Sequence, residues 1–483
     1  MIFLSDHSRV AIAFLATQGD LVMFRQVRSA FILAAVVAAS QFAVPVVAAV
    51  SAAQVGLDVG VSSPTMQAGE KSTNYIRIAL TGAELPQAET RPPVNVAIVI
   101  DTSGSMSGEK IVQARKAAIA AINRLQDRDI VSVVLYNSST EVLVPATKAT
   151  DRKSIIAKIR GIQADGNTAL FAGVSKGAAE VRKFLGADSV NRVILLSDGI
   201  ANVGPKSPRE LERLGASLVK EGISVSTLGL GLGYNEDLMS KLASAGSGNH
   251  IFVESADDLI AVFNSEFKDL MSVVACDFEI VATVASGVRP VRVLGTPADI
   301  TGNTIHIPLA QLYSRQERYF VLEVEVDAGE AGQSRPLVDV SVEYQNMTSE
   351  TMDKLTSSIA VRFSAESAEV QRDRDLETYA YCAVQIANEN NIRATALRDA
   401  GQVDDAKKLL NHNTKMLLQC AADCKTNNVD FVVPELEKNI EVNRYQALNV
   451  DNNRDWARNR KVMRGYQNEI QSQQSYSVEV PKK

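Results

Sequence analysis

The chain has 483 residues, of which 46% are hydrophobic and 22% are charged, and its formal net charge is −6 at pH 7. This is the composition of an ordinary globular protein, and the length allows about two to four domains. An acidic chain without a basic stripe of interleaved aromatic residues is not a general nucleic-acid binder. The four histidines are not paired at metal-ligand or triad spacing, and zinc-protease, serine-hydrolase and P-loop motifs are absent. The sequence therefore predicts a protein that is not an enzyme.

The N-terminal part of the chain has the order of a secretory signal. Basic residues near Arg25 precede an apolar run over 30–50 that ends in small residues. We expect cleavage after Ala49 or Ala53, and hence an exported protein in the periplasm or outside the cell. Two alternatives stay open: an uncleaved anchor, because the run is long enough to span a bilayer, and a true start at Met23.

The segment 93–275 alternates apolar strands with amphipathic helices. Strands are expected at 94–100, 130–136, 141–146, 191–197, 223–229 and 250–253. Helices are expected at 109–126, 151–160, 169–185, 207–221, 236–245 and 256–274. This alternation predicts an α/β domain with a doubly wound, Rossmann-like parallel sheet.

Polar residues follow two of these strands. Asp101 comes directly after one strand, with Ser103 and Ser105 in the same tight loop, and Asp198 comes directly after another. Thr168 lies in a loop between them. The carboxyl ends of parallel strands form the ligand-binding edge of such a sheet. Carboxylate and hydroxyl oxygens suit hard cations such as Mg²⁺, Ca²⁺ or Mn²⁺, so the five residues form a candidate metal site.

In type and order these five residues resemble the metal-ion-dependent adhesion site of the von Willebrand factor type A (VWA) family. The family pattern is Asp-x-Ser-x-Ser, then Thr, then Asp, and all five positions match. The resemblance covers about 93–275 and implies a bound divalent metal, with Mg²⁺ favoured over Ca²⁺ or Mn²⁺. It implies that Ser103, Ser105 and often Thr168 coordinate the metal directly. It also implies that Asp101 and Asp198 often act through water, and that an acidic side chain of a partner completes the coordination.

The flanking segments have a different pattern. Residues 54–92 and 276–364 contain short alternating strands separated by turns. This pattern favours one antiparallel β-sandwich, with the α/β domain inserted between its two parts. The alternative is that the two segments form two unrelated β structures. Residues 365–475 are helical, and residues 476–483 are expected to be disordered.

A break at Ala400-Gly401 predicts an antiparallel hairpin of helices over 366–398 and 403–424. In such a hairpin Cys382 lies opposite Cys420, and we expect a disulfide there in an oxidising compartment. Pairing through Cys424 and four reduced, buried thiols are the alternatives.

The sequence predicts an exported, metal-dependent binding module of the adhesion type, which captures an acidic group of a protein or envelope polymer. The alternative is a scaffold or assembly factor of an envelope complex, in which the metal site stabilises the fold or docks a subunit and the C-terminal helices carry oligomerisation. A metal-dependent phosphoester hydrolase is a third hypothesis, but no general base is evident. Contact with a membrane is expected only through an uncleaved N-terminal segment.

Overall fold

The computed structural model describes residues 54–85, 91–186 and 188–474. The predicted signal segment and the predicted disordered tail lie outside these described residues. Within them, no helix is both long and apolar enough to cross a membrane.

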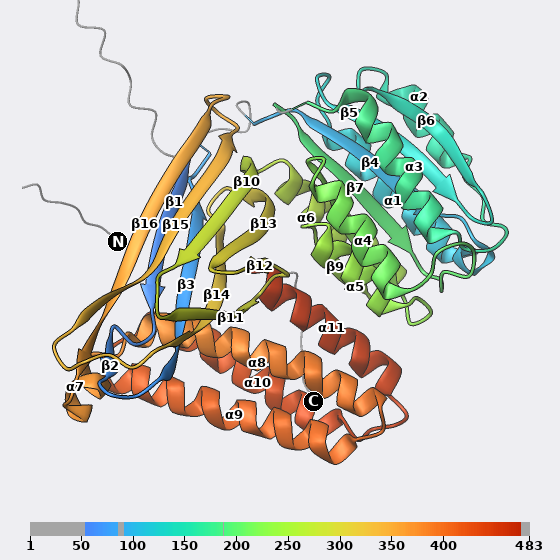
Figure 1. Cartoon of the computed structure of the whole chain (residues 1–483). Coiled ribbons are helices and arrows are strands. Elements are labelled where there is room, and N and C mark those ends of the chain that lie inside the picture. Colours follow the sequence, from blue (N-terminus) through green and yellow to red (C-terminus); the bar gives the residue numbers. More distant parts are fainter. Residues whose placement is uncertain (1–53, 86–90, 187, 475–483) are drawn as a thin grey trace, which may run out of the picture. The chain divides into compact units, whose positions relative to one another are not determined.

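A six-stranded sheet forms the centre of the α/β domain, in the order β6-β5-β4-β7-β8-β9 (Figure 1). Neighbouring strands pair in parallel, except that β6 runs antiparallel to β5. The strands are β4 (Val94–Asp101), β5 (Ile130–Tyr136), β6 (Thr140–Lys148), β7 (Val190–Ser197), β8 (Ile223–Leu230) and β9 (His250–Val253). The helices are α1 (Glu109–Arg124), α2 (Arg152–Arg160), α3 (Leu170–Val181), α4 (Pro208–Val219), α5 (Glu236–Ala245) and α6 (Leu259–Leu270). The predicted doubly wound α/β fold is confirmed.

The central strand β4 is buried along its whole length and mostly apolar, because helices cover both faces of the sheet. Val96 and Ile98 share a core with α1 and α6. Ala97 and Val99 point the other way, into a core with α3, α4 and α5. Successive residues of a strand face opposite sides, so a strand buried on both faces reads as a continuous apolar run.

Helix α3 lies unusually close to the sheet. A Cβ atom on Gly177 would lie 2.5 Å from Val99 Cγ2, and one on Gly173 would lie 2.7 Å from Tyr136 Cγ. Only glycine allows this approach. The close packing fixes the start of α3, and with it the preceding loop that carries Thr168.

Strands before and after the α/β domain share two further sheets. One has the order β1-β3-β14-β11 and is antiparallel; the other has the order β12-β13-β10-β15-β16-β2 and is antiparallel apart from the pair β16-β2. The strands are β1 (Val55–Val61), β2 (Thr65–Gln67), β3 (Ser72–Gly82), β10 (Val273–Val284), β11 (Val288–Leu294), β12 (Asp299–Thr301), β13 (Thr304–Tyr313), β14 (Glu317–Val326), β15 (Ser334–Asn346) and β16 (Met352–Ser364). Both sheets contribute to one apolar core, in which Ile78, Phe320 and Phe363 are fully buried.

The C-terminal region is helical, as predicted (Figure 1). It contains α7 (Ser367–Arg372), α8 (Leu376–Asp399), α9 (Val403–Thr426), α10 (Val433–Asn449) and α11 (Trp456–Ser472). Helices α8 and α9 pack against each other, and Gly401, at φ +81°, makes the turn between them. Helix α11 contacts α8 on one side and α5 and β9 of the α/β domain on the other.

Two predicted helices differ clearly from the structure, and three strands were not predicted individually. The last helix of the α/β domain ends at Leu270 and not at 274, because the apolar run from Val273 pairs with β13 and β15 as strand β10. The helix expected over 366–398 is split into α7 and α8, and Asp375 caps α8 by accepting a hydrogen bond from the Thr378 N–H at 2.9 Å. Strands β2, β12 and β16 were not predicted individually, although they lie in the segments expected to form the β-sandwich.

The predicted disulfide between Cys382 and Cys420 is wrong, because all four cysteines are free and buried. Cys382 packs with Leu294 and Val321 of the antiparallel sheet. Cys420 packs with Ala383 in the core between the hairpin helices. The prediction used the expected height of the two cysteines along the hairpin and not the direction of their side chains, and Cys382 faces the sheet.

Candidate metal site

Asp101 ends strand β4, and its carboxylate is fully buried. Its Oδ1 accepts a hydrogen bond from the Ser103 N–H at 2.8 Å. Its Oδ2 accepts from Ser197 Oγ at 2.7 Å and from Tyr136 OH at 3.3 Å. Burial raises the pKa of Asp101, and the hydrogen bonds from Ser103 and Ser197 oppose that rise. The carboxylate is therefore held in one orientation.

The two serine hydroxyls connect Asp101's loop to Asp198. A short 3-10 turn over Gly104–Met106 shapes the loop, and Ser103 Oγ lies 3.1 Å from Ser105 Oγ. Ser105 Oγ in turn donates to Asp198 Oδ1 at 2.8 Å. The structure thus brings residues from the ends of β4 and β7, which are neighbours in the sheet, into direct contact.

Thr168 is placed by hydrogen bonds from both sides of its loop. Its N–H donates to Asn202 Oδ1 at 2.9 Å, and the Asn202 N–H donates to the Thr168 carbonyl at 3.1 Å. The Gly104 N–H donates to the Gly166 carbonyl at 2.9 Å, which ties the loop to the serine-containing turn.

The oxygens of three predicted ligands surround Gly199. A Cβ atom on Gly199 would lie 3.0 Å from Thr168 Oγ1, 3.4 Å from Ser105 Oγ and 3.7 Å from Asp101 Oδ2. Side-chain oxygens from two separate chain segments, the loop 101–105 and the Thr168 loop, therefore converge beside Gly199 of a third segment. All five predicted site residues belong to this cluster, since Ser103 and Asp198 contact Ser105 directly.

Sequence reasoning missed four residues that shape the site. Ser197, Tyr136 and Asn202 position the predicted ligands, as described above. Lys110, in the first turn of α1, forms an ion pair with Asp198 Oδ2, and its Nζ lies 3.3 Å from the Ser105 carbonyl oxygen. Ser197 adjoins Asp198 and could have been suspected from the strand end, whereas the other contacts depend on the fold.

The side chains present fit a hard divalent cation. All are carboxylate or hydroxyl oxygens, with no nitrogen or sulfur ligand among the five. Within the described residues, no group of three or more His, Cys, Asp or Glu could hold a metal. Hydroxyls of Ser103, Ser105 and Thr168 would therefore supply much of the coordination of a metal ion, and the carboxylates of Asp101 and Asp198 would complete the set of five.

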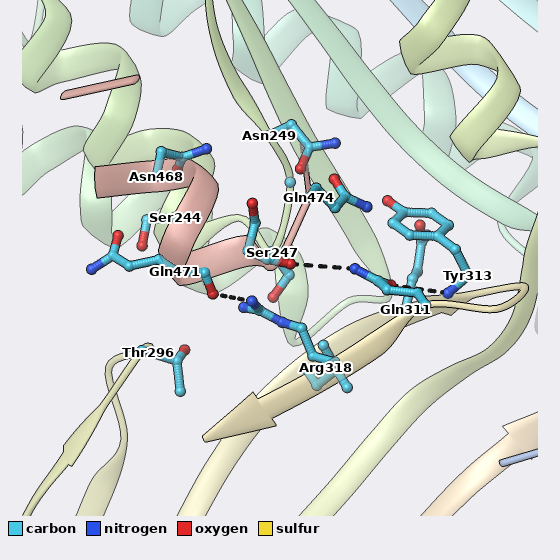
Figure 2. A pocket seen from close by; sticks show the side chains of 15 residues that line it. Ser244, Ser247, Asn249, Thr296, Gln311, Tyr313, Arg318, Asn468, Gln471 and Gln474 are labelled. Carbon is cyan, nitrogen blue, oxygen red and sulfur yellow. Dashed lines mark hydrogen bonds between the residues drawn. The ribbon is translucent and has the colours of Figure 1, made fainter. Parts of the chain in front are cut away.

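A separate polar cavity of about 30 Å³ lies where α11 meets β14 and the turn before β9 (Figure 2). Arg318 lines it and donates through Nη1 to the Gln471 carbonyl and to Gln473 Oε1, the latter at 2.7 Å. Burial lowers the pKa of Arg318 to about 10. Because the guanidinium donates to the Gln471 carbonyl near the C-terminal end of α11, we assign Arg318 a structural role.

Residues 95–265 match the family model of the von Willebrand factor type A domain. The α/β unit is a VWA domain. Proteins of this family are commonly involved in protein–protein interaction. The predicted family is thus established for this part of the chain.

Two relatives and one solved structure extend the comparison. The chain is 29% identical over 193 residues to YfbK of Escherichia coli, an uncharacterized protein, and this match covers 40% of the chain but only 34% of YfbK. It is 26% identical over 351 residues to sll0103 of Synechocystis, also uncharacterized, which covers 69% of the chain and 82% of the relative. A solved VWA protein from Catenulispora acidiphila superimposes with a TM-score of 0.65 at 18% identity, over 82% of this chain and 91% of that one. This similarity concerns the fold, and it extends beyond the VWA domain into the flanking regions.

Proposed function

We propose that the protein is an exported, divalent-metal-dependent binding module that captures a carboxylate of a protein or envelope polymer. The convergence of five hard oxygen ligands at the carboxyl ends of β4 and β7 carries the proposal. The VWA domain supports a binding role, because such domains commonly take part in protein–protein interaction. The signal-like order of the N-terminal sequence supports export.

A bound metal would supply the positive charge that bridges the site to an outside carboxylate. The chain's own residues provide the geometry. Ser197 and Tyr136 orient Asp101, and Asn202 positions Thr168. Only two of the five ligands are carboxylates, and the Lys110 ammonium cancels one of their two negative charges. The site therefore does not fully neutralise a divalent cation, and the occupied site retains affinity for an anion.

Exposed apolar side chains border the site. Ile200 follows Asp198-Gly199 after β7 and is 60% exposed, and Leu232 follows β8 and is 51% exposed. A Cβ atom on Gly233 would lie 2.9 Å from the Asp198 carbonyl oxygen, which places the Leu232 loop against the metal-site loop. We infer that both side chains contact the partner beside its carboxylate.

A scaffold role is the second candidate. Phe431 and Leu448, in the helical region, are 63% and 69% exposed and offer apolar groups for docking another subunit. The two candidates differ in their dependence on metal. For a binding module EDTA abolishes partner capture, whereas for a scaffold EDTA lowers the melting temperature and leaves capture through the helices.

Calorimetric titration of the purified protein with Mg²⁺, Ca²⁺ and Mn²⁺ tests the proposal. We expect saturable binding of one ion per chain. A capture experiment with envelope extract should then lose its bound partner in EDTA and recover it on adding Mg²⁺. The absence of binding for all three ions would refute the metal-dependent function.

A further inference from the structure

Lys110 places a fixed positive charge at the metal site. Helix α1 begins at Glu109, and Lys110 in its first turn pairs with Asp198, whose side chain is fully buried. The Lys110 side chain itself is 35% exposed, so the ion pair joins a partly exposed ammonium to a buried carboxylate. The N-terminus of α1 adds positive dipole charge at the same place.

We propose that Lys110 makes metal binding at this site depend on an acidic ligand. The inference rests on the proposed function, since it concerns the same metal site. Asp101 and Asp198 carry two negative charges and Lys110 carries one positive charge, which leaves one net negative charge. A divalent cation therefore turns the occupied site positive, whereas the same site without Lys110 would become neutral.

This charge balance has two consequences. The ammonium repels the incoming metal ion and competes with it for Asp198, so the affinity for metal alone is lowered. The occupied site keeps a positive charge that an outside carboxylate neutralises, so that ligand binds more tightly. Because coupling between two binding events is reciprocal, the carboxylate also strengthens metal binding. The protein would thus hold its metal firmly only while it holds its partner.

A purely structural role for Lys110 gives a different outcome. If the ion pair with Asp198 only stabilises the loop, removing the ammonium lowers the melting temperature and leaves metal affinity unchanged or weaker. The two roles are therefore separated by the direction in which metal affinity moves.

The test compares Lys110→Met with the wild-type chain. Lys116→Met, an exposed lysine on the same helix, is the matched control, and Lys110→Arg keeps the charge. Mn²⁺ affinity is measured by titration alone, then with acetyl-glutamate amide, and then with the neutral acetyl-glutamine amide. Thermal unfolding in EDTA verifies that each variant is folded.

We expect acetyl-glutamate amide, but not acetyl-glutamine amide, to raise the Mn²⁺ affinity of the wild-type chain. Lys110→Met should bind Mn²⁺ alone about tenfold more tightly than the wild type, because removing one unit charge near a divalent ion in a hydrated site has an effect of this size. The variant should also lose most of the increase in Mn²⁺ affinity that acetyl-glutamate amide causes in the wild type. Lys116→Met and Lys110→Arg should behave like the wild type. Unchanged or weaker Mn²⁺ binding in folded Lys110→Met would overturn the inference while leaving the proposed function intact. If the wild-type chain binds none of Mg²⁺, Ca²⁺ and Mn²⁺, with or without acetyl-glutamate amide, the proposed function fails, and the inference fails with it.

Discussion

At the scale of single residues, Ser105 is the simplest test of the metal site. Its hydroxyl contacts Ser103 and Asp198, yet the residue is exposed and contributes little to packing. Ser105→Ala should weaken divalent-metal binding at least about tenfold and change the free energy of unfolding without metal by less than about 0.5 kcal/mol. Ser107→Ala, in the same loop and also exposed, is the control. Equal metal affinities for the two variants, measured by calorimetry, would argue against Ser105 as a ligand.

Ile200 tests whether apolar contacts beside the site select the partner. The side chain is 60% exposed, so Ile200→Ser should not disturb the fold, and it removes no metal ligand. We expect the binding free energy of the partner to weaken by about 1–2 kcal/mol, because one aliphatic contact buried in the complex is lost. The metal affinity should not change. Ile300→Ser, at an exposed position on β12, should leave capture unchanged. A similar capture affinity for both variants would remove Ile200 from the interface.

The candidate ligands could be predicted from the sequence, whereas their supporting residues could not. Asp101, Ser103 and Ser105 form a contiguous motif, and Asp198 follows a recognisable strand. Lys110 follows the same motif by only a few residues, but nothing in its local sequence shows that its ammonium turns back to Asp198. That contact exists only because the sheet brings the ends of β4 and β7 together.

At the scale of elements, α3 transmits packing to the metal site. A Cβ atom on Gly177 would lie 2.5 Å from Val99 Cγ2, so Gly177→Ala forces the helix away from β4. We expect a loss of about 1–2 kcal/mol in unfolding free energy, since overpacking outweighs the better helix propensity of alanine. Metal affinity should also fall, because α3 anchors the Thr168 loop. Gly161→Ala, where the nearest atom would be 3.4 Å away, is the control in denaturant unfolding; a more stable Gly177→Ala would contradict this account.

Element predictions succeeded where local signals were strong. Helix α5 and strand β9 have the expected bounds, and Asn235 caps α5 by accepting hydrogen bonds from the N–H groups of Asp237 and Leu238. The apolar run after Leu270 fits either a helix or a strand, and only its pairing with β13 and β15 decides for a strand. Strand β16 was missed because its outward face is polar and its inward face has few large apolar residues before Ile359. The local sequence pattern cannot decide between helix and strand where the pairing with neighbouring strands determines the outcome.

At the scale of the whole molecule, α11 joins the VWA domain to the helical hairpin. The buried Lys461 donates to the Tyr234 carbonyl at 2.8 Å and pairs with Glu236 at 2.5 Å. Arg460 bridges Asp237 of α5, at 2.5 Å, and Asp399 of α8, at 2.8 Å. Such contacts span more than 60 residues of sequence and cannot be read from local pattern. The packing of α11 against the VWA domain therefore depends on these ion pairs.

We expect His250 to make this junction sensitive to acid. Its ring is buried on β9, with Nδ1 2.9 Å from Thr227 Oγ1, and its carbonyl accepts a hydrogen bond from Asn468 of α11. Burial lowers the pKa of His250 to about 4; Glu236 and Asp237 oppose this effect, and Lys461 and Arg464 add to it. In the unfolded chain its pKa is near 6.5, so between about pH 6.5 and pH 4 the unfolded state binds a proton that the folded state does not. This part of the stability is present above the unfolded pKa and is lost as the pH falls.

We therefore expect His250 to account for a loss of about 2 kcal/mol in unfolding free energy between pH 7 and pH 5. His250→Gln keeps a polar side chain near Thr227 and should remove this share of the pH dependence. His412→Gln, at an exposed position on α9, should keep the wild-type slope. Urea unfolding at the two pH values measures all three proteins. A His250→Gln slope as steep as that of the wild type would show that other groups, such as the Glu236 and Asp237 ion pairs, carry the acid sensitivity of the junction.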